Sequence, residues 1–430
     1  MRAVYLFLLY LIFPFIWLRL LWRARKAPAY AKHWAERLGQ LPFQLHAPSI
    51  WIHATSLGET IAATPIVLFL RQQFPDISIV ITSMTPTGRA KAQVLEDEKT
   101  HICYVPYDYP FAVKRFFRQA RPGLAIFIET ELWPTIIEQC AKENIPSLLV
   151  NARLSECSWR GYRRVAGLAR AMLQQISSIA AQTQAEAVRF ISLGAHPERV
   201  QVTGSLKFDL SVPEGLLEKA AALRQHYQVE RPVFIAASTH EGEDKLVLDA
   251  FLAVRQDYPA LLLVIVPRHP ERFDAVARLC EQTHLKVVRR SQGLPDADTA
   301  IYVGDTLGEL LLLYATADIA FIGGSLVAHG GHNPLEPAVF GVPILTGPHV
   351  FNFLDIVRLL RESGGLEQVS AENLASALMV WLQDPVLRRE KGRCAKRVLE
   401  KNRGALMKQL EWISKFVRES QRWKSISKQD

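Results

Sequence analysis

The sequence has few cysteines, and those it has are scattered. Five occur in 430 residues, at positions 103, 140, 157, 280 and 394, and none shows CxxC or Cys/His spacing. This argues against a zinc site and a disulfide framework, and it fits a reducing compartment. A GxGxxG dinucleotide fingerprint, internal repeats and low-complexity segments are missing as well. With 49% hydrophobic and 22% charged residues, the chain is globular and long enough for two domains.

Charge is missing from the N-terminal stretch between Ala3 and Leu18. This run is shorter than the roughly 20 residues of a membrane span, but Arg19 could snorkel, and Trp17 and Trp22 suit an interface. No small-residue cleavage site follows, which excludes a removable signal peptide. The basic flank after the run predicts that residues 1–26 form a membrane anchor, with the remainder in the cytoplasm. Whether the segment spans, lies in one leaflet or packs as a helix on the protein itself stays open.

Acidic residues are scarce in two basic stretches, so the net charge of +9 is unevenly distributed. Only Glu36 opposes six Lys and Arg residues between Arg19 and Arg37, and only Glu156 opposes the run from Arg153 to Arg170. Nucleic acid is one possible partner for such patches, and an anionic membrane or a phosphorylated lipid is the other. The apolar N-terminus favours the lipid and speaks against nucleic acid.

Apolar runs that end in small or polar residues alternate with helical patterns along the chain. The expected strands are 50–53, 77–81, 104–108, 124–128, 147–150, 176–181, 200–203, 233–237, 261–266, 300–303, 319–322 and 342–345. The alternation predicts two parallel, doubly wound, Rossmann-like α/β domains at 27–212 and 213–430, the second including helices from Leu382 to about Trp423. By analogy, two such domains facing across a cleft form the GT-B architecture of glycosyltransferases.

The first βα turn contains His53-Ala54-Thr55-Ser56-Leu57-Gly58-Glu59-Thr60. In open α/β sheets ligands bind beyond the carboxyl ends of the strands. Glu59 would lie at a helix N-terminus, where it could act as a base or only stabilise its own first turn. Glu129 follows five apolar residues, so it is buried or at a cleft edge and needs a partner or a shifted pKa. Lys207, near the predicted hinge, could be that partner, in catalysis or as a structural ion pair.

Three strand ends in the second half carry groups that suit a nucleotide. Arg268 follows Pro267, and a guanidinium there can pair with phosphate. Thr306-Leu307-Gly308-Glu309 opens a helix whose N–H groups could cradle phosphate. A glycine-rich loop enters a helix at Asn333-Pro334-Leu335-Glu336, where Asn333 could cap the helix and Glu336 could complete a capping box or accept hydrogen bonds from ribose hydroxyls. Asp296-Ala297-Asp298 has the form of a metal-binding acidic pair, but it precedes a strand, and we interpret it as a solvated loop.

Nine segments, spread in order over nearly the whole chain, together resemble a known family. They are 25–30, 56–60, 84–88, 129–134, 151–155, 203–209, 238–243, 266–273 and 330–337. The family is that of the 3-deoxy-D-manno-octulosonic acid (Kdo) transferases of lipopolysaccharide assembly, glycosyltransferase family 30. The resemblance implies an inverting GT-B enzyme at the cytoplasmic face of the bacterial inner membrane. It also implies CMP-Kdo as donor, a lipid A precursor (lipid IVA) as acceptor, and no metal.

The resemblance also implies roles for individual residues. Glu59 would be the general base, and Glu129 with Lys207 would stabilise the transition state. CMP contacts are implied for Pro267, Arg268, Leu307, Gly308, Glu309, Asn333, Pro334, Leu335 and Glu336. The basic stretches would then capture the anionic acceptor at the inner leaflet. On the motifs alone, a UDP-sugar transferase or epimerase and a membrane-bound nucleotide sensor without turnover remain alternatives, and nothing in them counts the Kdo residues transferred.

Overall fold

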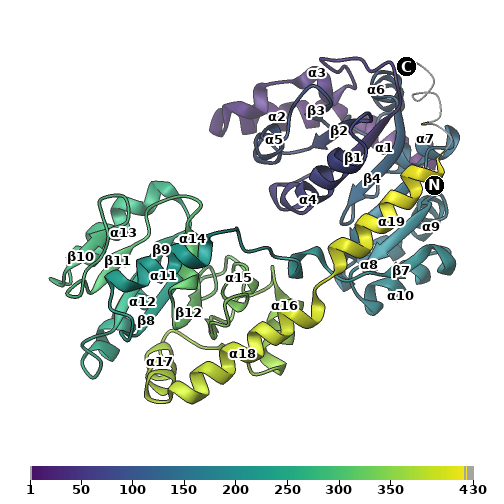
Figure 1. Ribbon diagram of the computed structural model, residues 1–430. Helices are drawn as coiled ribbons and strands as arrows, with labels where there is room; N and C mark the ends of the chain where they lie inside the picture. The colour runs from purple at the N-terminus through teal and green to yellow at the C-terminus, as the bar shows by residue number, and fades with distance from the viewer. Residues whose placement is uncertain (1, 421–422, 424–430) are drawn as a thin grey trace. The chain divides into compact units, whose positions relative to one another are not determined.

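In the computed structural model, which describes residues 2–420 and 423, the chain forms two compact units. The first comprises Met1–Leu206 and Gly404–Asp430, and the second comprises Lys207–Arg403. Each unit contains a seven-stranded sheet with helices on its faces (Figure 1). All strand pairs in both sheets are parallel. The predicted pair of doubly wound α/β domains is therefore confirmed.

Apart from the partly exposed edge strand Val200–Val202, the strands of the first unit are buried and largely apolar, as expected for a parallel sheet covered on both faces. They are β1 Ser49–His53, β2 Ser78–Ser83, β3 Thr100–Tyr104, β4 Pro122–Ile128, β5 Ser147–Ala152, β6 Ser178–Ala181 and β7 Val200–Val202. Their order is β3-β2-β1-β4-β5-β6-β7. The direction of winding reverses between β1 and β4, and this topological switch point is where doubly wound sheets bind ligands.

The predicted strand at 104–108 is wrong. The strand is Thr100–Tyr104, and Tyr104 is its last residue. Pro106 has no N–H to donate to a neighbouring strand, so the ladder cannot continue through it. The N–H of Tyr107 instead donates to the carbonyl of Arg37, outside the sheet.

Several helices of the first unit begin at side chains that cap them. Ser56, Thr85, Ser155 and Thr183 each accept a backbone N–H as N-caps. The helices are α1 Arg2–Leu11, α2 Phe13–Lys26, α3 Trp34–Arg37, α4 Leu57–Gln73, α5 Pro86–Gln93, α6 Pro110–Ala120, α7 Pro134–Lys142, α8 Glu156–Arg164, α9 Ala166–Leu173, α10 Gln184–Ser192 and α19 Ala405–Glu419, with 3-10 turns η1 Pro28–Ala31 and η2 Pro197–Arg199.

Helix α19 belongs to the first unit, which corrects its predicted place in a domain 213–430. Leu410 and Val417 are buried in the apolar cluster that also contains β1, β4 and α4 side chains. The amide of Gln409, also buried, donates to the Thr203 hydroxyl at 2.8 Å. The chain therefore returns to the first unit after completing the second, and Figure 1 shows α19 in yellow beside the purple and blue elements. The second unit also begins earlier than predicted, at Lys207.

The second unit repeats the same winding. Its strands are β8 Val233–Thr239, β9 Leu262–Pro267, β10 Val287–Arg289, β11 Ile301–Val303, β12 Ile319–Ile322, β13 Ile344–Thr346 and β14 Leu366–Gln368. Their order is β10-β11-β9-β8-β12-β13-β14, so the switch point lies between β8 and β12. The two edge strands, β10 and β14, are three residues each and were not predicted, because such short runs carry little periodic signal.

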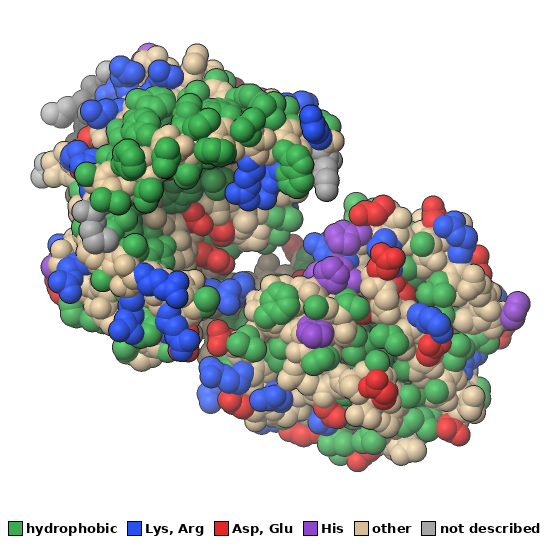
Figure 2. All heavy atoms as spheres, turned by 180° about the vertical axis from the view of Figure 1, so that it is seen from behind, with side chains coloured by type: hydrophobic (Ala, Val, Ile, Leu, Met, Phe, Trp, Pro, Cys, Tyr) green, Lys and Arg blue, Asp and Glu red, His purple; other side chains and the backbone are tan. Residues whose placement is uncertain are grey.

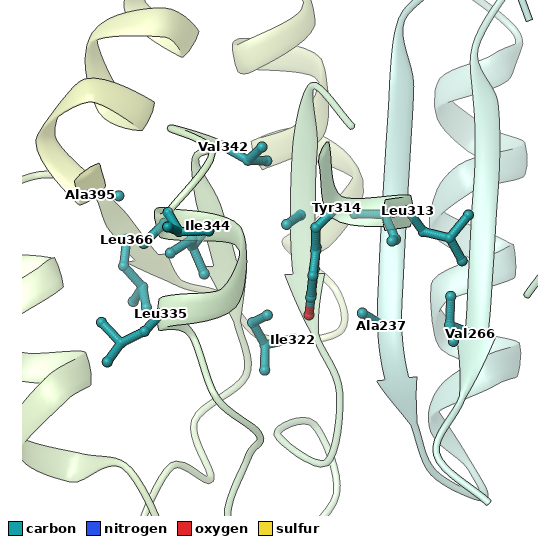
Figure 3. Packing of buried hydrophobic residues seen from close by; sticks show 14 of the residues in the cluster. Ala237, Val266, Leu313, Tyr314, Ile322, Leu335, Val342, Ile344, Leu366 and Ala395 are labelled. Atoms are coloured by element: carbon teal, nitrogen blue, oxygen red, sulfur yellow. The ribbon is translucent and has the colours of Figure 1, made fainter. Parts of the chain in front are cut away.

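Helices cover both faces of this sheet. They are α11 Leu216–His226, α12 Glu243–Arg255, α13 Phe273–Glu281, α14 Leu310–Ala315, α15 Leu335–Ala338, α16 Leu354–Glu362, α17 Leu374–Gln383 and α18 Pro385–Asn402, with 3-10 turns η3 Leu206–Phe208 and η4 Pro270–Arg272. Figure 3 shows part of one core, in which Leu313 and Tyr314 of α14 pack with Ala237, Val266 and Ile322 from the three central strands. This packing fixes the carboxyl ends of β8, β9 and β12 relative to one another.

The two N-terminal helices have one covered face and one exposed face. Phe13 and Trp17 pack against the cluster of Tyr107 and Tyr109, and the Tyr5 hydroxyl donates to the Asp108 carboxylate at 2.8 Å. In the described part of the chain no single helix is long and apolar enough to cross a membrane. Together α1 and α2, bent by 47°, meet that test of length and composition. The expectation that this segment packs on the protein itself is therefore met on one face of the two helices.

Candidate active site

Glu59 lies at the switch point of the first sheet, in the first turn of α4. Its carboxylate is held by the backbone N–H of Thr55 at 2.7 Å and by the hydroxyls of Thr55 and Ser56 at 2.8 Å. In return the Ser56 oxygen accepts the N–H of Glu59 as the helix cap. The side chain therefore does stabilise its own helix start, as one interpretation of the sequence proposed. Glu59 is buried, with 8% of its surface exposed. Its hydrogen bonds therefore hold the carboxylate in one position, with a small part of the residue still open to solvent.

Two further carboxylates follow β4 on the other side of the same switch point. Glu131 accepts the indole N–H of Trp133 at 2.8 Å, and its other oxygen lies 3.2 Å from the Thr55 hydroxyl. Burial raises the pKa of Glu131, and the charges of Glu59 and Glu129 raise it further. The Thr55 hydroxyl has one hydrogen and faces both Glu59 and Glu131, an arrangement that is satisfied when Glu131 carries a proton.

The backbone of Glu129 lies in the left-handed region, with φ of 63°. For a non-glycine residue this costs roughly 1 kcal/mol or more, and such strain is concentrated at functional sites. Glu129 belongs to the first unit and Lys207 to the second. Lys207 lies in η3, with its ammonium 5.2 Å from the centre of the Phe353 ring. The predicted Glu129–Lys207 pair stays a prediction.

The sequence also makes Glu131 a candidate, without a role of its own, but it did not assign Thr55 or His53 to the site. His53 ends β1 and is fully buried, with Nδ1 2.9 Å from the Thr82 hydroxyl. Burial lowers its pKa to about 3, so the imidazole is neutral beside Glu131. The sequence shows that Glu131 and His53 lie at strand ends. It does not show their partners, Thr55 and Thr82, because these follow or belong to other strands.

In the second unit Arg268 and Glu336 follow strands β9 and β12, which lie on either side of β8. Arg268 follows β9 and its side chain is exposed. Glu336, in α15 after β12, has its pKa raised to about 7 by burial, and the nearby Asn333 amide and Arg268 charge limit the rise. The Asn333 side chain accepts the N–H of Leu335 at 3.1 Å. In a capping box it would instead accept the N–H of Glu336. Leu335 itself is in the core.

Glu309 has a partner that the sequence did not indicate. Both of its oxygens are bound by the Arg290 guanidinium, at 2.7 and 2.9 Å, and the Thr306 hydroxyl also donates to it. The hydrogen bonds from Arg290 lower the pKa of Glu309. The side chain is therefore occupied, whereas the preceding Leu307 is 75% exposed and Gly308 has a positive φ of 82°. What this loop offers to solvent is its main chain and Leu307.

The remaining predicted residues are placed as follows. Pro267 is the last residue of β9, and Pro334 is buried just before α15. Asp296 and Asp298 lie in an exposed loop before β11, where Asp296 pairs with Lys286 and accepts the Thr299 hydroxyl. Among the residues the structure describes, no group of three or more His, Cys, Asp or Glu is placed to hold a metal ion.

Two parallel-sheet domains of this kind, each with polar groups at its switch point, form the GT-B fold. The crystal structure of Anabaena Alr3699/HepE in complex with UDP shares the fold, with a TM-score of 0.55 over 86% of this chain and 99% of that chain. The two sequences are 14% identical, so this likeness shows the fold alone.

Sequence relatives narrow the class to a family. Residues 32–210 match the family described as 3-Deoxy-D-manno-octulosonic-acid transferase (kdotransferase). The 3-deoxy-D-manno-octulosonic acid transferase of Haemophilus influenzae is 43% identical, covering 91% of this chain and 93% of its own length. That of Bordetella pertussis is 34% identical, covering 97% and 99%. The chain belongs to the 3-deoxy-D-manno-octulosonic acid transferase family of glycosyltransferases, as the resemblance predicted.

Proposed function

We propose that the chain moves Kdo from CMP-Kdo to a lipid A precursor in lipopolysaccharide synthesis, with inversion and with Glu59 as general base. The observation that carries this proposal is the fixed carboxylate of Glu59 at the β1/β4 switch point. The acceptor hydroxyl would replace one of the two protein hydroxyls on that carboxylate. Glu59 takes the hydroxyl proton while the oxygen bonds to the anomeric carbon, and the bond to phosphate breaks with its electrons on CMP.

Donor binding is proposed for the second unit. Arg268, exposed after β9, would pair with the phosphate, and Glu336 would accept the ribose hydroxyls. Because the Glu309 carboxylate is bound by Arg290, we propose that Leu307, Gly308 and Glu309 contact CMP through their main chain. Asn333, Pro334, Leu335 and Pro267 would shape the surrounding pocket. The guanidinium would meet the charge on the departing phosphate, so the reaction would need no metal.

Mass spectrometry of one incubation tests this function. We expect purified protein with CMP-Kdo and lipid A precursor to release CMP and to give a product heavier by one or more Kdo units, which the spectrum also counts. CMP should inhibit, and UDP should not. Turnover of a UDP-sugar without turnover of CMP-Kdo would favour the alternative enzyme, and nucleotide binding without any product would favour a sensor.

We propose that the exposed face of α1 and α2 lies in the cytoplasmic leaflet of the inner membrane. Figure 2 shows a broad hydrophobic patch on the first unit, and the largest side chains exposed on these helices include Phe7, Phe15 and Trp22 at 68%, 63% and 58%. The opposite face of α1 and α2 packs on the first unit, through contacts such as the hydrogen bond from Tyr5 to Asp108. Since one face stays on the protein, the segment would lie in one leaflet, and Arg19 and Arg23 would face anionic headgroups.

Replacing Phe7, Phe15 and Trp22 together with serine is expected to lower binding to anionic phospholipid vesicles by at least about tenfold, because each loses an aromatic side chain from the lipid. Vesicle sedimentation measures this. A matched triple change of exposed apolar residues outside these helices, Val94, Val229 and Met407, should leave binding unchanged. Equal losses in the two triple variants would contradict the assignment of this face.

A further inference from the structure

Four histidines that no proposed role includes gather at the switch point of the second unit. His240 follows β8, His269 follows β9, and His329 and His332 lie in the glycine-rich loop after β12. The ring of His329 stacks on that of His240 with centres 4.1 Å apart, and His269 meets His240 edge-on at 5.3 Å. Figure 2 shows histidine side chains close together on this unit. The cluster thus joins the residue after Arg268 to the loop that leads to Glu336.

The centre of the cluster is a hydrogen-bonded imidazole pair. The Nε2 atoms of His240 and His332 are 2.8 Å apart, and their ring planes differ by 8°. Two nitrogens at this distance share one proton, so one ring donates and the other accepts. The pair can take one further proton at Nδ1 and keep this bond, because an imidazolium N–H then faces a neutral imidazole. A second added proton would place N–H against N–H.

The pair is neutral in the free protein and lies in a positive environment. Burial, together with the charges of the other histidines and of Arg268, lowers the pKa of both His240 and His332 to about 4. Arg272 adds to this effect on His240, but it is bound to Asp244. Glu243 accepts the backbone N–H of His240, and the rest of its carboxylate is occupied by main-chain N–H groups of the loop after β12. In the described structure the Arg268 guanidinium has no ion pair.

We propose that the His240–His332 pair belongs to the phosphate site and takes up one proton when a nucleotide phosphate binds beside Arg268. The inference rests on the proposed donor site. An anion next to the cluster offsets the positive charges that hold the pair neutral, so it favours the protonated form. Phosphate affinity must by linkage rise as the pH falls through the raised pKa of the bound state. The pair would thus add a positive charge only when the site is filled.

The backbone around the pair supports a built site. Gly324 has a positive φ of 69°, and a Cβ there would lie 3.2 Å from His332 and 3.3 Å from His240. The main chain of the loop therefore covers the inner side of the pair, which only glycine allows. The N–H of Gly324 is directed to Glu243 at 2.5 Å, so the loop is tied to the start of α12 as well.

Calorimetric titration of the full chain with CMP, in two buffers of different ionisation enthalpy at about pH 6.5, measures the protons taken up. We expect wild type to take up about half a proton more per CMP than His332→Asn. The variant should also bind CMP about fivefold more weakly near pH 6, with a smaller loss near pH 8. Protons released by Glu336 and by the CMP phosphate itself are common to both proteins, so the difference isolates the pair.

The control is His226→Asn, which replaces an exposed histidine at the end of α11 and should match wild type. If CMP binds to wild type and to His332→Asn with equal proton uptake, this inference is wrong and the donor site stands. If CMP does not bind to wild type, both fail. Should His332→Asn not fold, nitrogen chemical shifts of ¹⁵N-histidine in the wild type decide the matter. CMP must then raise the pKa of two histidines, and unchanged values would overturn the proposal.

Discussion

Replacing Glu59 with glutamine is expected to lower the transfer rate by about 10²–10⁴-fold and to leave CMP binding within about twofold of wild type. Glutamine keeps an oxygen that can accept the Thr55 N–H, so the start of α4 should persist with a loss of about 1 kcal/mol in unfolding free energy. It cannot take the proton of the acceptor hydroxyl. Steady-state assays with CMP-Kdo and lipid A precursor, together with CMP titration, separate these effects.

Glu131→Gln is the matched comparison, because Glu131 shares the Thr55 hydroxyl with Glu59 and lies at the same switch point. Its pKa is raised by burial, and we interpret it as the protonated member of the pair. An amide can replace a protonated carboxyl, so this variant should retain most of its activity. Full activity in Glu59→Gln, or loss of activity only in Glu131→Gln, would show that Glu59 is not the base.

Glu243→Gln is expected to lower the unfolding free energy of the second unit by roughly 3–5 kcal/mol. The Glu243 carboxylate is fully buried and accepts four backbone N–H groups. They belong to His240, Gly324, Ser325 and Leu326, so one side chain ties the end of β8 to the loop after β12. In a glutamine the amide NH2 would replace one of the two carboxylate oxygens and would face two backbone N–H groups. Those N–H groups would then have no acceptor. Chemical denaturation measures the loss.

Glu241→Gln provides the control, since Glu241 lies two residues earlier and is exposed. Its unfolding free energy should stay within about 0.5 kcal/mol of wild type. Hydrogen exchange adds a local readout, because the amides of Gly324, Ser325 and Leu326 should exchange faster only in Glu243→Gln. If both variants unfold at the same denaturant concentration, the carboxylate does not hold the loop.

The fold was largely predictable because each βα unit has a recognisable hydrophobic pattern within its own short stretch of sequence. An apolar run that ends in small or polar residues, followed by a capped helix, identifies most strands to within a few residues, as with β1 and β12. The assignment of α19 failed for a different reason. Its sequence shows an amphipathic helix, but which apolar surface covers that face depends on α4 and β4, which lie hundreds of positions earlier.

The positions of candidate residues were predictable where a single strand end supplies them, as for Glu59 after β1 and Arg268 after β9, and their roles stay predictions. The site was not predictable where two distant segments meet. His240 and His332 are 92 positions apart and share a hydrogen bond, and Thr55 meets Glu131 across 76 positions. Partners can also occupy a residue that looks free in the sequence, which is why the binding of Glu309 by Arg290 changes its expected role.

The return of the chain to the first unit has a consequence for biosynthesis. The ribosome delivers β1 to β7 first and then the whole of Lys207–Arg403, and only afterwards the residues of α19. The first unit therefore waits with an uncovered apolar face until Leu410 and Val417 have emerged, whereas the second unit already has its full sequence. Domains generally fold as units during synthesis. For this protein we expect the order of folding to run against the order of translation, with the later unit finished first.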